Sequence, residues 1–187
     1  MQSKFNDLFL DLCESESDIA DHLPILAFLA SQCHHVTEFG VRTGHSTVAF
    51  LHGLEQNKNA QLISYDINDA YGVHPSCFSL TSVDWRFMQF STLDIPEIYK
   101  TETDFLFIDT LHTYAQVTQE LRLHGDRVRK WIGFHDTQTF GQRGEDGGMG
   151  IVQAIKDWLA AHNEWRIVYT TKRNNGMMLI ERCSATL

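Results

Sequence analysis

Short apolar runs alternate with helix-like segments between residues 34 and 163, and this alternation constrains the fold more than any other feature of the sequence. The predicted strands cover residues 34–41, 61–66, 85–90, 104–109 and 131–136, and the main predicted helices cover 45–57, 114 to about 129 and 150–163. Strands that alternate with helices build a parallel sheet. Two further strand-like runs, 165–171 and 176–182, flank an Asn-Gly turn signal, which favours an antiparallel hairpin. The sequence therefore predicts an α/β fold whose mostly parallel sheet ends in a hairpin.

The length and charge of the chain limit its organisation and its partners. One domain most simply accommodates 187 residues, with N-terminal helices over residues 1–33 and an α/β core over residues 34–182. No apolar run approaches the roughly 18 residues that cross a bilayer, and the first residues carry acids where a secretion signal carries basic side chains. We therefore expect a cytoplasmic protein with no membrane partner. The formal net charge of −9 disfavours a nucleic-acid partner, because it repels a polyanion.

Acidic residues end four of the five predicted parallel strands: Glu38, Asp66, Asp109 and Asp136. The carboxyl ends of parallel strands point to one edge of a sheet, where ligands bind in folds of this class. A single acid at such a place is often only a cap or a turn former. Four acids in one crevice would repel one another, so we expect something cationic to offset them. Their spacing divides them into two pairs, each one strand-helix-strand unit apart.

The first pair, Glu38 and Asp66, flanks a glycine turn. Gly40 and Gly44 would let the chain turn tightly and let a ligand approach the backbone, and Ser46 follows in the same turn. The spacing is not the G-x-G-x-x-G that binds pyrophosphate, which Glu38 would in any case repel. S-adenosylmethionine suits the pattern better, because it has cationic groups for Glu38 and a ribose for Asp66. We therefore predict that these five residues bind S-adenosylmethionine.

Residues 30–182 resemble a class I S-adenosylmethionine-dependent methyltransferase. The segments EFGVRTGHST, FMQFSTLDI, FIDTLHTY, GFHDT and NNGMMLIER are similar to the branch that contains macrolide-sugar O-methyltransferases and cephalosporin-hydroxylase-like proteins. The resemblance implies a Rossmann-like three-layer sandwich with a seven-stranded sheet. It also implies that Glu38, Gly40 and Gly44 hold the methionine end of the cofactor and that Asp66 holds the ribose.

Three positions depart from the family pattern. Ser91 stands near the expected adenine site, where the family more often has an aspartate, and it completes the predicted cofactor-binding set. Thr110 and Leu111 replace the glycine and aspartate of the family's usual FIDGDHSY. These departures keep open the alternative of a catalytically degenerate protein that binds the cofactor or serves as an interaction module.

The second pair, Asp109 and Asp136, has His135 beside it, and these three residues form the predicted metal site. Mg²⁺ uses one or two carboxylates and completes its shell with water or substrate oxygen. Related O-methyltransferases have a divalent metal at this place, which the resemblance extends to this chain. A histidine ligand is also compatible with Mn²⁺ or Zn²⁺. The alternative is that Asp109 caps the following turn and that Asp136 packs against a backbone amide.

His112 lies just ahead of a helix start that Thr113 and Gln116 mark as a capping box. A neutral imidazole accepts a proton near pH 7 without a large pKa shift. We predict that His112 and Asp109 are catalytic, with a metal that lowers the pKa of an acceptor hydroxyl and His112 as the base. The alternative is an ordinary histidine at a helix start.

The sequence thus favours metal-assisted O-methylation of a small hydroxylated acceptor, such as a sugar or a glycosylated metabolite. A nicotinamide-dependent oxidoreductase is disfavoured, because the G-x-G-x-x-G motif is missing. Acceptor selection must come from residues 68–80, from the glycine-rich stretch 141–150, from the N-terminal helices or from a partner subunit, so a homo-oligomer is compatible with the sequence. The stretch 141–150 is either a lid that closes on substrate or a mobile surface loop.

Overall fold

The computed structural model describes residues 4–69 and 81–183. The chain divides into two compact units, residues 1–92 and residues 93–187, and the predicted single domain stays a prediction. In the described ranges, no helix combines the length and the apolar character that crossing a membrane requires.

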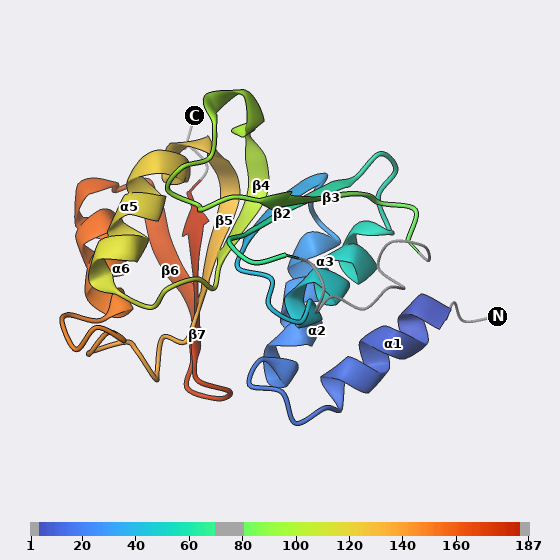
Figure 1. Ribbon diagram of the computed structural model, residues 1–187, viewed down its shortest axis with the longest axis horizontal. Coiled ribbons are helices and arrows are strands. Elements are labelled where there is room, and N and C mark those ends of the chain that lie inside the picture. The colour runs from blue at the N-terminus through green and yellow to red at the C-terminus, as the bar shows by residue number, and fades with distance from the viewer. Residues whose placement is uncertain (1–3, 70–80, 184–187) are drawn as a thin grey trace. The chain divides into compact units, whose positions relative to one another are not determined.

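The first unit contains three parallel strands and the N-terminal helices (Figure 1). The strands have the order β3-β2-β1 and comprise β1 (His35–Phe39), β2 (Gln61–Asp66) and β3 (Asp84–Gln89). The helices are α1 (Lys4–Cys13), a 3₁₀ turn (Ala20–His22), α2 (Leu23–Ala30) and α3 (His45–Leu54). Helices α2 and α3 pack closely at Gly53, where an added Cβ would lie 2.1 Å from the carbonyl oxygen of Ala27.

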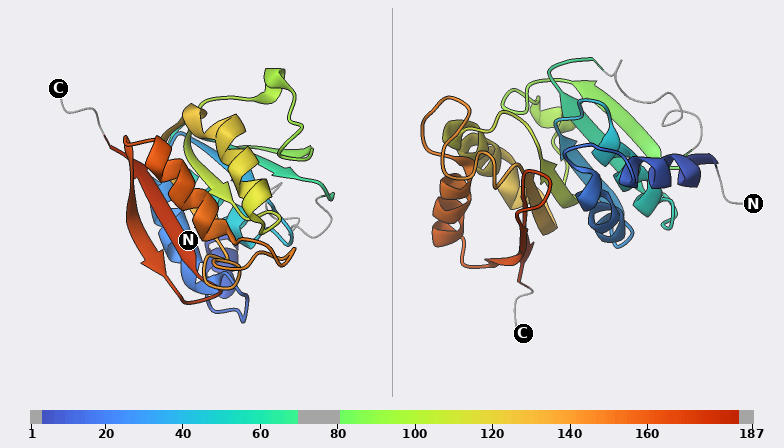
Figure 2. Two further views of the ribbon diagram at one scale, coloured as in Figure 1. Left: turned by 90° about the vertical axis from the view of Figure 1, so that its left-hand side faces the viewer. Right: turned by 90° about the horizontal axis from the view of Figure 1, so that it is seen from below.

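The second unit contains four strands in the order β4-β5-β7-β6. They are β4 (Thr103–Ile108), β5 (Val128–His135), β6 (Trp165–Thr171) and β7 (Met177–Arg182), preceded by a 3₁₀ turn over Glu97–Tyr99. Strands β4 and β5 are parallel, whereas β7 is antiparallel to both of its neighbours. Helices α5 (Tyr114–His124) and α6 (Ile151–Ala161) lie side by side (Figure 2, left).

The two units together have the seven strands, the mostly parallel pairing, the antiparallel hairpin and the flanking helices that the sequence predicts. The fold class is therefore confirmed. The second arm of the hairpin, β7, pairs with β5, and this leaves β6 at the edge. Asn174, Asn175 and Gly176 turn the hairpin with φ of 40°, 65° and 90°, values that asparagine and glycine adopt more readily than other residues.

One predicted helix was too long. Helix α5 was expected to reach about Arg129, but it ends at His124 and is followed by a 3₁₀ turn over Gly125–Arg127. Strand β5 then begins at Val128, because Val128 already pairs with Thr103 of β4. Gly125 also has a packing role, since a Cβ at this position would lie 2.6 Å from the ring of Trp158 in α6.

Candidate functional site

Glu38 lies near the end of β1, and its side chain is fully buried. Its Oε1 accepts a hydrogen bond from Ser46 Oγ at 2.6 Å, and its Oε2 accepts from Thr47 Oγ1 at 2.8 Å and from Ser64 Oγ at 2.6 Å. Three neutral hydroxyls therefore compensate the buried charge and tie the first turn of α3 to β1 and β2. A direct contact of Glu38 or Ser46 with a cofactor would require one of these hydroxyls to move, and both contacts stay predictions.

The glycine turn between β1 and α3 is held by Asp66. Gly40, Arg42 and Gly44 have φ of 85°, 49° and 80°, so the turn uses left-handed backbone at its two glycines and also at Arg42. Asp66 Oδ2 accepts hydrogen bonds from the backbone N–H groups of Val41, at 2.8 Å, and of Arg42, at 3.2 Å. Asp66 thus fixes the backbone that would face the cofactor, while its half-buried side chain stays at the strand end that the sequence predicts. Its contact with a ribose stays a prediction.

Ser91 follows β3 and is half-buried in the first unit. Its predicted contact with the adenine is untested. Of the stretch 68–80, residues 70–80 lie outside the described residues.

In the second unit, His112 lies at the centre of a cluster of carboxylates. Its Nε2 is 3.1 Å from Asp109 Oδ1 and 3.1 Å from Asp136 Oδ2, and its Nδ1 is hydrogen-bonded to Glu145 Oε1. The ring also stacks on Phe140, with 5.0 Å between the centroids. The imidazole is therefore held from both nitrogens and from one face, and both nitrogens point at acids.

His135 joins the same two aspartates from β5. Its Nδ1 lies 3.1 Å from Asp136 Oδ2 and 3.4 Å from Asp109 Oδ1, and its Nε2 lies 3.1 Å from the backbone carbonyl oxygen of Asn174. A carbonyl accepts only, so Nε2 carries a proton and cannot bind a metal. Nδ1 of His135 faces the same two aspartates as Nε2 of His112 does, and the role of His135 as a metal ligand stays a prediction.

The charges in the cluster reinforce one another. Burial alone would lower the pKa of His135, but the hydrogen bonds and charges of Asp109 and Asp136 outweigh it and raise that pKa to about 10. Burial likewise opposes the charged form of His112, yet Asp109, Asp136 and Glu145 together raise its pKa. In turn, the two imidazoles overcome the effect of burial on Asp109 and hold its pKa well below its usual range. Without a metal, the cluster is a network of ions.

Asp109, His112 and Asp136 meet the geometric requirement for a metal site. Each offers a ligand atom, and the three atoms lie within 4.8 Å of one another. Asp136 is 5% exposed, and its Oδ1 is buried with no hydrogen-bond partner in the described part of the chain. Its backbone has φ of 57°, a conformation that a non-glycine residue seldom adopts. An unpaired buried carboxylate oxygen is costly, and a cation would offset the cost.

Glu145 is the residue of this cluster that the sequence did not single out. It comes from the glycine-rich stretch, and its side chain accepts hydrogen bonds from both the backbone N–H and the ring of His112. In return, the Glu145 N–H donates to the carbonyl oxygen of His112 at 3.1 Å. The only signal for it in the sequence is its position shortly after Asp136.

The glycines of this stretch allow close backbone packing. A Cβ at Gly141 would lie 2.0 Å from the carbonyl oxygen of Thr137, and one at Gly150 would lie 2.3 Å from that of Phe140. Hydrogen bonds within the stretch, such as Gly144 N–H to the Gly148 carbonyl at 3.1 Å, hold its shape. The structure therefore gives these glycines a packing role, while closure on a substrate stays a prediction.

The departures of the segment FIDTLHTY have a local explanation at one position. Thr110 Oγ1 donates to Glu120 Oε1 at 2.8 Å, so this hydroxyl helps to satisfy a carboxylate that is fully buried in α5. Leu111 is 53% exposed, and nothing in the structure explains why leucine stands at this position. The predicted cap is confirmed in part: Thr113 Oγ1 accepts from the Gln116 N–H at 3.2 Å, but the Gln116 side chain turns to Glu120.

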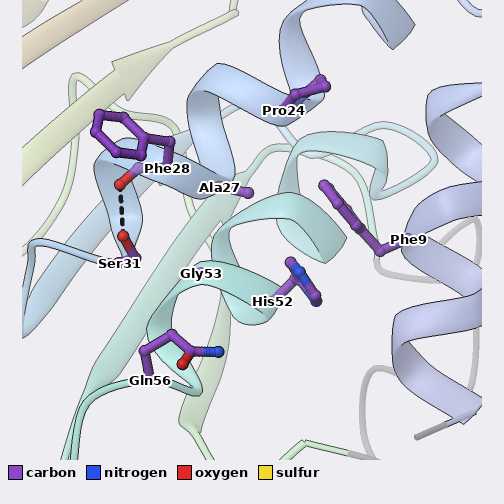
Figure 3. A pocket seen from close by; sticks show the side chains of 8 residues that line it. All are labelled: Phe9, Pro24, Ala27, Phe28, Ser31, His52, Gly53 and Gln56. Atoms are coloured by element: carbon purple, nitrogen blue, oxygen red, sulfur yellow. Dashed lines mark hydrogen bonds between the residues drawn. The ribbon is translucent and has the colours of Figure 1, made fainter. Parts of the chain in front are cut away.

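An apolar pocket of about 270 Å³ lies between α1, α2 and α3 of the first unit (Figure 3). The ring of Phe9 stacks on that of His52 at 4.1 Å, and Pro24 and Phe28 also line the pocket. Burial lowers the pKa of His52. The pocket contains none of the predicted site residues and no carboxylate, so it is not the candidate site.

Comparisons with known proteins agree with the fold. A family model described as a methyltransferase domain matches residues 37–137, more than half of the chain. A search of the curated proteins gives no significant match. The match to the family model includes Glu38, Asp66, Asp109 and Asp136.

Solved structures of the same fold include an O-methyltransferase from Bacillus cereus in complex with SAH, at a TM-score of 0.66 and 15% identity over 97% of this chain and 92% of that chain. TomG, an O-methyltransferase from Streptomyces achromogenes in complex with SAM, has a TM-score of 0.65 and 16% identity over 88% and 81%. A candidate O-methyltransferase from Klebsiella pneumoniae has a TM-score of 0.67 and 16% identity over 98% and 92%. The similarity of these structures to this chain establishes its fold, which is Rossmann-like. On the match of the family model, the chain belongs to the methyltransferase-domain family.

Proposed function

We propose that the protein transfers the methyl group of S-adenosylmethionine to a hydroxyl of a small acceptor, with the assistance of a divalent cation. The observation that carries this proposal is the cluster of Asp109, His112 and Asp136, whose ligand atoms lie within 4.8 Å of one another. Membership of the methyltransferase-domain family supports methyl transfer. Two solved structures of this fold are complexes with SAM or SAH, which favours the same cofactor here.

In the first unit, the glycine turn and Asp66 form the proposed cofactor site. The positive φ values at Gly40 and Gly44 leave the backbone free of side chains where a ligand would approach. Asp66 holds this backbone through the N–H groups of Val41 and Arg42. The proposed roles are that the turn binds the methionine end and that Asp66 accepts hydrogen bonds from the ribose hydroxyls.

In the second unit, Asp109, His112 and Asp136 are the proposed metal ligands. His112 belongs to this set because its ligand atom lies within 4.8 Å of those of both aspartates. The predicted ligand His135 faces the same two aspartates through its Nδ1. Glu145 holds Nδ1 of His112, which directs Nε2 toward the two aspartates. A divalent cation, when bound, would lower the pKa of an acceptor hydroxyl near it. The mixed nitrogen and oxygen ligands suit Mn²⁺ or Zn²⁺ as well as Mg²⁺.

The predicted base role of His112 competes with its role as a ligand, because both need the same Nε2. The contacts favour the ligand role, since an imidazole that points both nitrogens at carboxylates keeps both protons unless a cation displaces one. In either case the protein mainly aligns the acceptor oxygen with the methyl group, and the cofactor supplies the electrophile.

The cofactor assignment is tested by calorimetric titration with S-adenosylmethionine, S-adenosylhomocysteine and NAD. We expect the first two to bind and Asp66→Ala to weaken both, while Asp84→Ala, a change at an exposed acid on β3, leaves binding intact. Binding of NAD alone would reject the proposal in favour of an oxidoreductase. Binding of S-adenosylmethionine without formation of S-adenosylhomocysteine, across hydroxylated acceptors with Mn²⁺, would favour the degenerate cofactor-binding module.

A further inference from the structure

A second cavity lies in the second unit, next to the proposed metal ligands. It has a volume of about 490 Å³, within the range of roughly 300–1,000 Å³ that is usual for small-molecule sites. Residues 137–139, Arg143, Lys156 and Lys172 are prominent in its lining. Residue 137 directly follows Asp136, and Arg143 lies two positions before Glu145. The chain segment that carries Asp136 and Glu145 therefore also contributes to the wall of this cavity.

The lining of the cavity is positively charged in an acidic protein. Arg143, Lys156 and Lys172 contribute three cations, and the described residues that line the cavity include no carboxylate. The whole chain, by contrast, has 24 acids against 15 lysines and arginines. Among the described residues, no ion pair is found for these three side chains. The cations of this unit that do form ion pairs are others: Lys100, Arg127, Arg129, Lys130 and Arg166.

The wall of the cavity is fixed by the hairpin turn. The backbone N–H groups of Gln138 and Thr139 donate to the carbonyl oxygen of Asn175 at 2.8 and 3.1 Å. Gly176 sits so close that a Cβ there would lie 2.4 Å from the backbone nitrogen of Gln138. This turn also leads from Lys172 into β7. Arg143 lies on a loop, Lys156 on α6 and Lys172 on the hairpin turn. Backbone hydrogen bonds join residues 138 and 139 to this turn.

We infer that this cavity binds an anionic group of the methyl acceptor and that this group is a phosphate. A phosphate monoester carries a charge of about −1.5 to −2 at pH 7 and three acceptor oxygens, which suits three cations and the hydroxyls of Thr137 and Thr139. The acceptor is then a small hydroxylated compound that bears a phosphate. The inference rests on the proposed function only in naming the ligand a methyl acceptor, because anion binding here is independent of methyl transfer.

Titration with inorganic phosphate tests the site without the cofactor. Calorimetry is done on the full chain with a metal chelator present and with ionic strength held constant by KCl. We expect saturable binding of phosphate to the wild type. In the double variant Lys156→Gln, Lys172→Gln we expect affinity to fall about tenfold or more, since two charge-assisted contacts are lost. Lys58→Gln, a change at an exposed lysine of the first unit, should bind phosphate as the wild type does.

Two results of this titration would overturn the inference: equal affinity of the double variant and the wild type, or tighter binding of acetate than of phosphate. Circular dichroism checks that the double variant is folded. We expect it to fold, because Lys156 and Lys172 are exposed. If the wild type binds S-adenosylmethionine but not phosphate, only the phosphate site is rejected. If the wild type binds phosphate but not S-adenosylmethionine, the proposed function is rejected and the anion site is kept.

Methyl transfer then tests the link to the acceptor. A panel of hydroxylated compounds, each paired with its monophosphate, is assayed for S-adenosylhomocysteine formation. We expect the wild type to prefer the monophosphates by at least tenfold in kcat/KM, and the double variant to lose this preference while it keeps S-adenosylmethionine affinity. Equal use of both members of each pair by the wild type would refute the acceptor assignment.

Discussion

Glu38 and Asp136 are buried acids at the ends of parallel strands in different units, yet their surroundings differ. Glu38 is fully buried, and three neutral hydroxyls donate to its two carboxylate oxygens. Asp136 is 5% exposed, faces His112 and His135, and keeps one oxygen without a hydrogen-bond partner among the described residues. A saturated carboxylate is suited to hold structure together, whereas an unsaturated one among imidazoles is suited to receive a cation. Acidic residues at the same kind of position therefore have surroundings suited to two different roles.

Removal of the Glu38 carboxylate should have the largest effect on stability. Glu38→Ala leaves three buried hydroxyls without their acceptor and opens a cavity. We expect a loss of roughly 3 kcal/mol or more in the free energy of unfolding, measured with urea. The change Asp136→Asn should cost less, about 1–3 kcal/mol in metal-free protein, because it weakens the contacts with His112 and His135 but also removes the charge on an unpaired buried oxygen. Equal losses of stability for the two variants would contradict the proposed difference between Glu38 and Asp136.

Replacement of His112 separates its two possible roles. If His112 is a ligand, His112→Gln should weaken Mn²⁺ binding on the order of 100-fold, measured by electron paramagnetic resonance of free Mn²⁺, since loss of a group that merely orients a ligand already costs roughly 10–100-fold. If His112 is instead the base, Mn²⁺ affinity is kept and methyl transfer falls roughly 10²–10⁴-fold. The first outcome supports the proposed metal set, and the second restores the base role that the sequence predicted.

Glu145 should act on the metal through His112. Glu145→Gln weakens the hydrogen bond to Nδ1 of His112. We expect Mn²⁺ affinity to fall roughly 10–100-fold, as for other groups that orient a metal ligand. The neighbouring change Asp146→Asn is the control, because Asp146 accepts a hydrogen bond within its own loop, from the Gly148 N–H at 2.9 Å. If both variants bind Mn²⁺ as the wild type does, Glu145 has no positioning role.

The ion network should make the metal-free protein sensitive to alkaline pH. The pKa of His135 is raised to about 10 in the folded state, above its ordinary value of about 6.5. Its contribution to stability is therefore fully present below about pH 6.5 and is lost as the pH rises toward 10, by up to about 1.4 kcal/mol per pH unit. Urea unfolding at pH 7, 8 and 9 with a chelator measures this slope. A slope as steep in His135→Gln would assign the effect to another group.

The sequence predicted the strand-end acids because each apolar run visibly ends at one. Asp66 ends β2, and Asp109 and Asp136 directly follow β4 and β5. What surrounds each acid was not visible, since the partners come from distant segments. Ser64, which donates to Glu38, lies on the neighbouring strand, and Glu145 is 33 positions from His112. The partner of Nε2 of His135 is likewise distant in the sequence, because it is a carbonyl of the hairpin turn, at Asn174.

The expectation that all four acids share one crevice stays a prediction. Within the units, Asp66 holds the turn that follows Glu38 through the backbone of Val41, and His112 joins Asp109 to Asp136. The fold was easier to predict than the site, because helix and strand periodicity is local and side-chain pairing is not.

The most direct test of the contrast between Glu38 and Asp136 is calorimetric titration of Mn²⁺ into the wild type and Asp136→Asn, both folded and free of metal. We predict one saturable site in the wild type and an affinity at least about 100-fold lower in the variant, which loses the carboxylate whose Oδ1 is unpaired. Equal affinities, or no Mn²⁺ binding by the wild type, would contradict the assignment of this carboxylate to a cation.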